Sequence, residues 1–158
     1  MSFSTFEQIE AWREARTLTR IVRRFCRVAI AKKDWAWADQ ISRAAVSIMA
    51  NIAEGNDSTT NAEFMQFLGY AKRSDAEVRS HLYYGFDEGY LTSAEFEDAS
   101  ARTKKIGGQL AALIHYLSQH SGGRRVSKTS NELTSNQLTL LGTFFIHTLN
   151  HFNDIILR

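Results

Sequence analysis

The sequence contains no proline and a single cysteine, and it lacks long hydrophobic runs. A chain of 158 residues with the usual proline content would carry roughly eight prolines. Because no proline removes a backbone donor or clashes with a preceding turn, long uninterrupted helices are allowed. Cys26 has no partner for an intramolecular disulfide, and no segment approaches the roughly 20 apolar residues of a membrane-spanning helix. The N-terminal residues show no apolar signal core, so we expect a cytoplasmic protein without membrane contact.

The charges are balanced in number but unevenly placed. The net charge is +2, and residues 1–120 hold 15 basic and 15 acidic side chains. Between Arg13 and Lys33, however, eight basic residues accompany a single acid, Glu14. This stretch is therefore the strongest concentration of positive charge in the sequence.

Four segments carry apolar residues at helical spacing and predict an all-α fold. We expect helices from about Thr5 to Ala31, from Trp35 to Glu54 after an Asp34 cap, from a Thr60 or Asn61 cap to Gly89, and from a Thr92 or Ser93 cap to Leu117. The short connections imply an antiparallel up-down-up-down four-helix bundle over residues 1–120.

Three glycines bear on these helices. Gly55 follows the second helix, where a left-handed C-cap would favour a residue without a Cβ atom. Gly107 and Gly108 lie within the apolar seam of the fourth helix, where each costs about 1 kcal/mol relative to alanine. We expect either a bend there or the close approach of another backbone.

The character of the sequence changes after residue 120. Residues 121–136 are polar, with paired glycines and a basic patch, and predict a linker. Residues 137–158 form an apolar tail with a broad hydrophobic face, which is a possible fifth helix. The bundle is thus expected to carry an atypical C-terminal extension.

A polar stripe runs along the second helix, which is otherwise apolar. It consists of Arg43, Ser47, Asn51 and Glu54. A hydrogen-bonded network that holds helices or subunits in register, a partner-binding surface and a catalytic site are the three explanations. On the third helix, Asp75 falls at a position of the apolar seam. Asp75 and Glu77 could pair with Arg43 across helices, or they could lie on an exposed turn.

The residues needed for common catalytic and metal sites are not assembled in this sequence. A di-iron bundle requires Glu-x-x-His on two helices and two further carboxylates, whereas Glu77 and His81 are four residues apart and occur once. Cys26 stands alone, and His147 and His151 form only a pair. Phosphate-binding glycine loops and nucleophile elbows are missing as well. We expect a non-enzymatic protein with no metal, no cofactor and no small-molecule substrate.

The first helix carries a basic face opposite its apolar face. This arginine face consists of Arg16, Arg20, Arg23, Arg24 and Arg27. Neutralising phosphates with such groups releases condensed counterions and gives affinity without sequence preference. The face predicts binding of RNA or a nucleoprotein. The alternative is a solvated face partly cancelled by acids on a neighbouring helix, among them Glu95, Glu97 and Asp98.

The three tryptophans could supply surfaces for stacking, but their spacing predicts that they pack within the bundle instead. Trp12 lies on the apolar face of the first helix. Trp35 and Trp37 begin the second helix and are expected to seal that end of the bundle.

Four ordered blocks carry a resemblance to a known family: FEQIEAWREARTLTRIV, QISRAAVSIMANIAEG, EFMQFLGYAKRSDAEVRSHL and DEGYL. They resemble the bacterial four-helix-bundle proteins encoded by intervening sequences of large-subunit ribosomal RNA genes, over about residues 6–117. The resemblance implies a left-handed bundle, a ring-shaped homopentamer and no known catalytic activity. A related branch resembles the accessory proteins of diversity-generating retroelements, whose basic surface binds a reverse transcriptase and nucleic acid. Residues 121–158 match nothing expected of the family.

Two functions follow from these observations. The first is an oligomeric, non-enzymatic bundle that binds RNA or a nucleoprotein through the arginine face. The second is a scaffold whose partners are itself or other proteins, without nucleic acid.

Overall fold

The computed structural model describes residues 4–120, and its regular elements are helical. A short 3₁₀ turn, η1 (Phe6–Gln8), precedes the helices α1 (Glu10–Ala31), α2 (Trp35–Asp57), α3 (Asn61–Asp87) and α4 (Ser93–Gln119). The first helix begins five residues later than predicted, because Ile9 adopts an extended backbone conformation between η1 and α1. The predicted linker and apolar tail lie outside the described residues.

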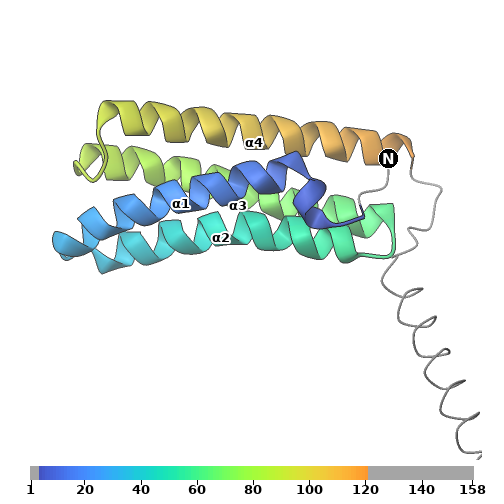
Figure 1. Ribbon diagram of the computed structural model, residues 1–158, viewed down its shortest axis with the longest axis horizontal. Coiled ribbons are helices and arrows are strands. Elements are labelled where there is room, and N and C mark those ends of the chain that lie inside the picture. Colours follow the sequence, from blue (N-terminus) through green and yellow to red (C-terminus); the bar gives the residue numbers. More distant parts are fainter. Residues whose placement is uncertain (1–3, 121–158) are drawn as a thin grey trace, which may run out of the picture. The chain divides into compact units, whose positions relative to one another are not determined.

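The four helices form a closed antiparallel bundle, as the sequence predicts. Helix α1 packs on α2, α2 on α3, α3 on α4, and α4 returns to contact α1. Figure 1 shows the four helices side by side, with the α1–α2 and α3–α4 connections at the same end of the bundle. Within residues 4–120, no helix is long and apolar enough to cross a membrane.

One hydrophobic core fills the space between the helices. The largest side chains with less than 2% exposure come from all four helices and include Phe25, Ile48, Phe64 and Leu110. These residues lie at the helical spacing found in the sequence, so each helix buries one stripe. Removal of this apolar surface from water contributes the largest share of the free energy that favours the fold.

Side-chain caps begin three of the four α-helices. The Asp34 carboxylate accepts a hydrogen bond from the backbone nitrogen of Trp37, and the Thr60 hydroxyl accepts one from Glu63. Thr92 and Glu95 form a reciprocal capping box at the start of α4. Each satisfies backbone donors that the first turn leaves unpaired. Helix α1 differs, since its N-cap residue is Ile9 and no side chain caps it.

The predictions for the glycines need correction. Helix α2 continues through Gly55 to Asp57, and Gly55 is not in the left-handed region. A Cβ atom at residue 55 would lie 2.6 Å from a ring carbon of Phe64, so this glycine permits close packing of α2 and α3. Helix α4 is continuous through Gly107 and Gly108. What approaches Gly107 is the Asp75 carboxylate, 3.3 Å from the position of a Cβ atom, and not another backbone.

Trp37 seals the end of the bundle where the two connections meet. Its ring is buried, its Nε1 donates to the carbonyl of His81 at 3.0 Å, and it packs against Tyr90 with 4.9 Å between ring centroids. The hydroxyl of Tyr90 donates to Asp34 at 2.8 Å, which ties the α3–α4 connection to the α1–α2 connection. The same role was predicted for Trp35, and that prediction is wrong, because Trp35 is 62% exposed.

We expect Gly85→Ala to destabilise the protein by about 1–3 kcal/mol, because a new methyl group would collide with the buried ring of Trp37 and with Leu91. Gly69→Ala in the same helix is the matched control. Nothing lies within 4 Å of a Cβ atom at residue 69, so alanine should stabilise the helix there by up to about 1 kcal/mol. Urea unfolding followed by circular dichroism measures both changes. Equal effects of the two substitutions would contradict this account of the packing.

Candidate nucleic-acid interface

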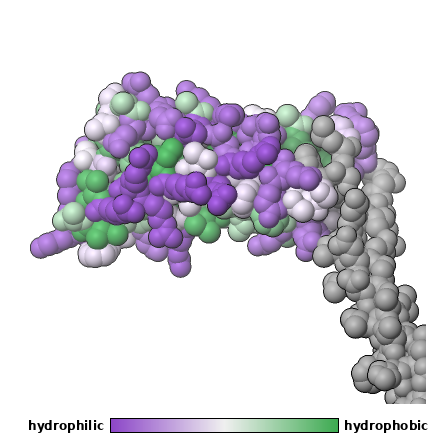
Figure 2. All heavy atoms as spheres, viewed as in Figure 1, coloured by the Kyte–Doolittle hydropathy of each residue, from purple (hydrophilic) through white to green (hydrophobic). Residues whose placement is uncertain are grey.

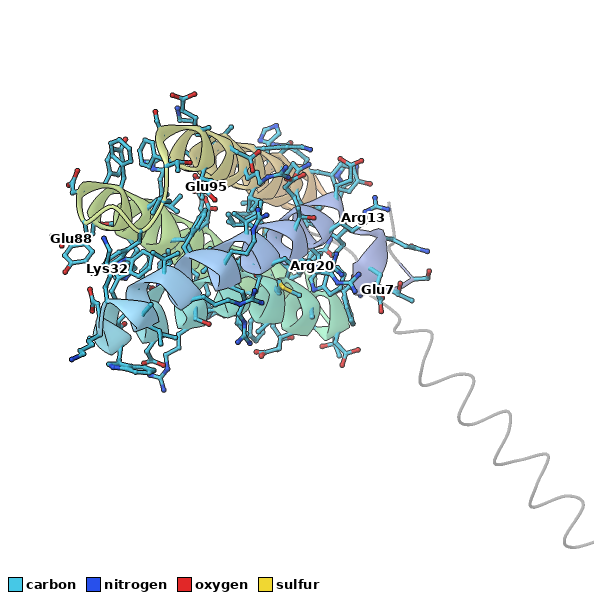
Figure 3. The ribbon with its side chains drawn as sticks, turned by 60° about the vertical axis from the view of Figure 1, so that its left-hand side comes forward. Glu7, Arg13, Arg20, Lys32, Glu88 and Glu95 are labelled. Carbon is cyan, nitrogen blue, oxygen red and sulfur yellow. The ribbon has the colours of Figure 1, made fainter. Side chains whose placement is uncertain are left out.

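All five residues of the arginine face lie exposed on one side of α1. Spacings of three and four residues keep these side chains on the solvent side of the helix, opposite buried residues such as Leu18 and Val22. Figure 3 shows Arg13 and Arg20 extending from α1 away from the bundle. In Figure 2, hydrophilic side chains gather across the middle of the face over which α1 runs.

Glu14, the single acid of the basic stretch between Arg13 and Lys33, pairs with cations of another helix. Glu14 is only 13% exposed and binds two cations of α4, accepting hydrogen bonds from Arg102 and from Lys105, the latter at 2.8 Å. The hydrogen bond from Lys105, together with that from Arg102, lowers the pKa of the Glu14 carboxyl below its usual value. The lone acid of the basic stretch therefore joins α1 to α4.

Among residues 4–120, no acidic side chain forms an ion pair with any member of the arginine face. Arg16 lies over the ring of Trp12, 5.8 Å from the ring centroid. By contrast, Arg13 pairs with Glu10 and Arg102 with Asp98. The five guanidinium groups thus remain available to an external anion.

The three acids predicted to cancel this charge are mostly engaged on α4 itself. Asp98 binds Arg102 at 3.1 Å, and Glu97 accepts a hydrogen bond from Ser93. Hydrogen bonds from Thr92 lower the pKa of Glu95, and the nearby charge of Arg24 contributes less. No ion pair joins these three acids to the arginine face within residues 4–120, although the charge of Arg24 acts on Glu95.

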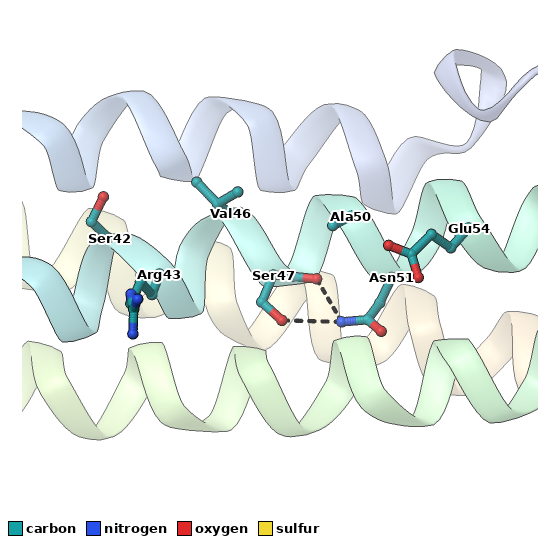
Figure 4. Close-up of a pocket in the computed structure, with 7 residues that line it drawn as sticks. All are labelled: Ser42, Arg43, Val46, Ser47, Ala50, Asn51 and Glu54. Carbon is teal, nitrogen blue, oxygen red and sulfur yellow. Dashed lines mark hydrogen bonds between the residues drawn. The ribbon is translucent and has the colours of Figure 1, made fainter.

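The polar stripe of α2 divides into two parts. The amide of Asn51 donates to the carbonyl of Ser47 at 2.8 Å and to its hydroxyl at 3.0 Å, and that hydroxyl bonds Ser74 of α3 at 2.9 Å. Figure 4 shows Ser47 and Asn51 joined by these bonds. This part forms the interhelical network that the spacing indicated.

The remaining stripe residues point elsewhere. Arg43 pairs with Asp39 one turn earlier at 3.4 Å, and both side chains are exposed. Glu54 is exposed at the far end of the stripe. Glu77 lies 3.9 Å from His81 on its own helix. The predicted pairing of Arg43 with Asp75 or Glu77 is therefore not formed.

Asp75 is buried in the core, as its position in the apolar seam of the third helix predicted. It is 6% exposed, and its Oδ1 atom has no hydrogen-bond partner among residues 4–120. Burial raises the pKa of this carboxyl to about 7, and the charge of Arg79 only partly offsets the effect. The missing side chain of Gly107 provides the space for Asp75.

The metal-ligating side chains of the described part of the chain are not gathered in groups of three. Among residues 4–120, no three histidine, cysteine or acidic side chains lie close enough to hold a metal ion. Cys26 is buried, and burial raises the pKa of its thiol, which disfavours the reactive thiolate. The pair His147 and His151 lies outside the described residues.

An exposed aromatic ring beside the arginine face was not predicted from the sequence. Trp35 borders a shallow groove between α1 and α2, and Arg23 lines the same groove. The position of Trp35 directly after the Asp34 cap is a sequence signal for the first turn of a helix, where side chains project beyond the packed seam. That signal was available, but the apolar character of tryptophan favoured a buried assignment.

Comparisons with known proteins agree with the fold. The family model described as 23S rRNA-intervening sequence protein matches residues 7–112. A solved structure from Bacteroides thetaiotaomicron VPI-5482, a protein of unknown function from the S23 ribosomal protein family, is similar with a TM-score of 0.61 and 24% identity. The match covers 66% of this chain and 97% of that one. No curated protein matches the chain.

The buried Asp75 predicts that stability falls as the pH rises. The folded state holds the carboxyl proton up to about pH 7, whereas the unfolded chain releases it near its ordinary value of 3.8. Unfolding is therefore favoured progressively between those two values, by up to about 4 kcal/mol in total. Urea unfolding at about pH 5 and pH 8 measures the loss.

Asp75→Asn is the control for this pH dependence, since an amide cannot titrate in this range. The variant should lose less stability than the wild type between the two pH values. If both proteins respond equally to pH, the titrating group is not Asp75.

Proposed function

Because the chain belongs to the family of 23S rRNA-intervening sequence proteins, we propose that it binds RNA or an RNA–protein complex through the arginine face of α1. The observation that carries the proposal is that five exposed arginines share one face and none forms an ion pair with an acid of residues 4–120. The family description names the intervening sequence of 23S rRNA, which makes RNA the first polyanion to test.

The chemistry of the face suits phosphate. A guanidinium presents several donors in a planar fork that matches phosphate oxygens, and it forms stronger hydrogen bonds with charged acceptors than with neutral ones. Each contact releases counterions from the RNA, so affinity falls as salt rises. Arginine also remains protonated at physiological pH and cannot serve as a general base. We therefore propose a binding function without catalysis.

Self-association is the second candidate function, and the outer face of α2 favours it. Ser42, Val46 and Ala50 line a shallow groove beside the polar stripe, and Val46 is 46% exposed. Figure 4 shows these small side chains spaced along α2. Small residues let another helix approach closely, and an exposed valine gains from burial. A homopentamer, as the family resemblance implies, would multiply the arginine faces on one particle.

Reversing two charges tests the RNA proposal. Arg20→Glu combined with Arg27→Glu should weaken binding of a labelled structured RNA at least tenfold at physiological salt. It should also flatten the dependence of log affinity on log salt by about 1 for each arginine. Fluorescence anisotropy over a salt series measures both quantities.

The matched control is Lys72→Glu combined with Lys104→Glu. It changes the net charge equally on α3 and α4, where both lysines are exposed and form no ion pair within the described part of the chain. The control should retain most of the affinity. Equal losses in the two variants would show that net charge alone governs binding, and unchanged binding in the arginine variant would reject the interface.

A second pair of variants tests self-association. Val46→Glu should reduce the mass in solution toward the 17.9 kDa of one chain, because it places a charge in the α2 groove. Val28→Glu is the control, since Val28 on α1 is similarly exposed at 41% and lies outside that groove. Light scattering after size-exclusion chromatography gives both masses. A mass unchanged by Val46→Glu would exclude this face as the contact.

A further inference from the structure

We propose that the groove between α1 and α2 holds one unpaired RNA nucleobase, stacked on the indole ring of Trp35, while Arg23 binds an adjacent phosphate. The inference rests on the proposed function and adds a preference for single-stranded segments over duplex RNA.

The groove combines an apolar floor with a cation and an exposed ring. Arg23, Cys26 and Ile30 of α1 and Trp35, Ala38 and Asp39 of α2 contribute to its lining. Cys26 and Ala38 are buried, and Ile30 is half-buried. Such a floor suits a flat aromatic ligand, because the faces of a nucleobase are apolar and its edges are polar.

The ring of Trp35 has no aromatic or cationic partner among residues 4–120. Trp12 and Trp37 differ in this respect, since each packs against another ring. Trp35 nevertheless begins α2 directly after Asp34, whose carboxylate accepts hydrogen bonds from the backbone of Trp37 and from the hydroxyl of Tyr90. The exposed ring of Trp35 is thus carried by a backbone that these hydrogen bonds hold, and its aromatic surface is open to stacking.

The charges at the two sides of the groove orient the ligand. Arg23 belongs to the arginine face, so a strand that follows this face reaches the groove with a phosphate near that guanidinium. Asp39 lies on the α2 side, where one carboxylate oxygen pairs with Arg43 at 3.4 Å and the other can accept a hydrogen bond from the amino group of a base. The backbone is therefore expected on the α1 side and the base on the α2 side.

The groove is expected to favour single-stranded over duplex RNA, in addition to attracting negative charge. In a duplex the bases are already stacked and paired, and proteins contact mainly phosphates and 2′-hydroxyls. In loops, bulges and single strands a base can leave the stack and lie on an aromatic side chain, with little dependence on its identity. Arginines alone would bind both forms, so the preference for unpaired bases depends on Trp35.

The test compares an unstructured single-stranded RNA of 12 nucleotides with a blunt duplex of the same sequence. Trp35→Ala should reduce affinity for the single strand by roughly tenfold or more and leave duplex binding unchanged. Trp35→Phe should restore most of the loss, because it keeps an aromatic face. Tyr83→Ala is the matched control, since Tyr83 is a 58% exposed aromatic side chain on α3. Circular dichroism confirms that each variant is folded.

The outcomes separate this inference from the proposed function. Loss of single-strand binding in Trp35→Ala with rescue by phenylalanine supports the stacking site. Unchanged binding in Trp35→Ala, together with loss in the Arg20→Glu and Arg27→Glu variant, overturns the stacking site and leaves the proposed function intact. Failure of the wild type to bind either RNA overturns both. Equal losses for strand and duplex in Trp35→Ala also overturn the stacking site.

Discussion

The Glu14 carboxylate, bound by Arg102 and Lys105, joins the first helix of the bundle to the last. The other neighbouring helices are consecutive in sequence and are held together by short connections, whereas α1 and α4 meet only through side-chain contacts. Glu14 lies at this seam with little exposure to solvent, where an ion pair is screened less than at the open surface. Because the carboxylate is committed to α4, it cannot neutralise the arginines on its own helix. The Glu14 bridge thus ties α1 to α4 and leaves the arginine face without an ion pair to the one acid of its own basic stretch.

Helices α2 and α3 make the most extensive helix–helix contact of the bundle. The ring of Phe64 lies against Gly55, and the ring of Trp37 lies against Gly85. A side chain at either glycine would collide with the ring beside it. The Ser47–Ser74 hydrogen bond crosses the same pair of helices. Asp75 opposes this stability, because its buried carboxyl lacks a partner at Oδ1 among the described residues. A buried polar group without a partner is costly.

In the proposed function, the arginine face and Trp35 would give this surface two kinds of affinity. The guanidinium groups attract phosphate over a distance and without regard to sequence, and their effect declines with salt. The exposed indole acts only at contact and through stacking, which salt affects little. A surface that combines both would distinguish a folded RNA with unpaired bases from a plain duplex. The arginine face lies on a helix that packs against α2 and α4, so the backbone positions of its five arginines are set by the bundle.

The sequence alone predicted the fold and the family because both depend on local periodicity and ordered blocks. The apolar spacing decides which face of each helix is buried, and the side chains of Asp34, Thr60 and Thr92 decide where three helices begin. The clustering of arginines on one face followed from the same periodicity. Tertiary contacts decided the rest. Helix α2 continues through Gly55, whose missing side chain leaves space for Phe64 nine residues later. Arg43 pairs with Asp39 on its own helix, and Asp75 is buried against Gly107. Glu14 is withdrawn from the arginines by cations about 90 residues away in the chain. Periodicity identifies the buried face of a helix, but it does not say which residues of two helices meet, since that depends on how the helices pack.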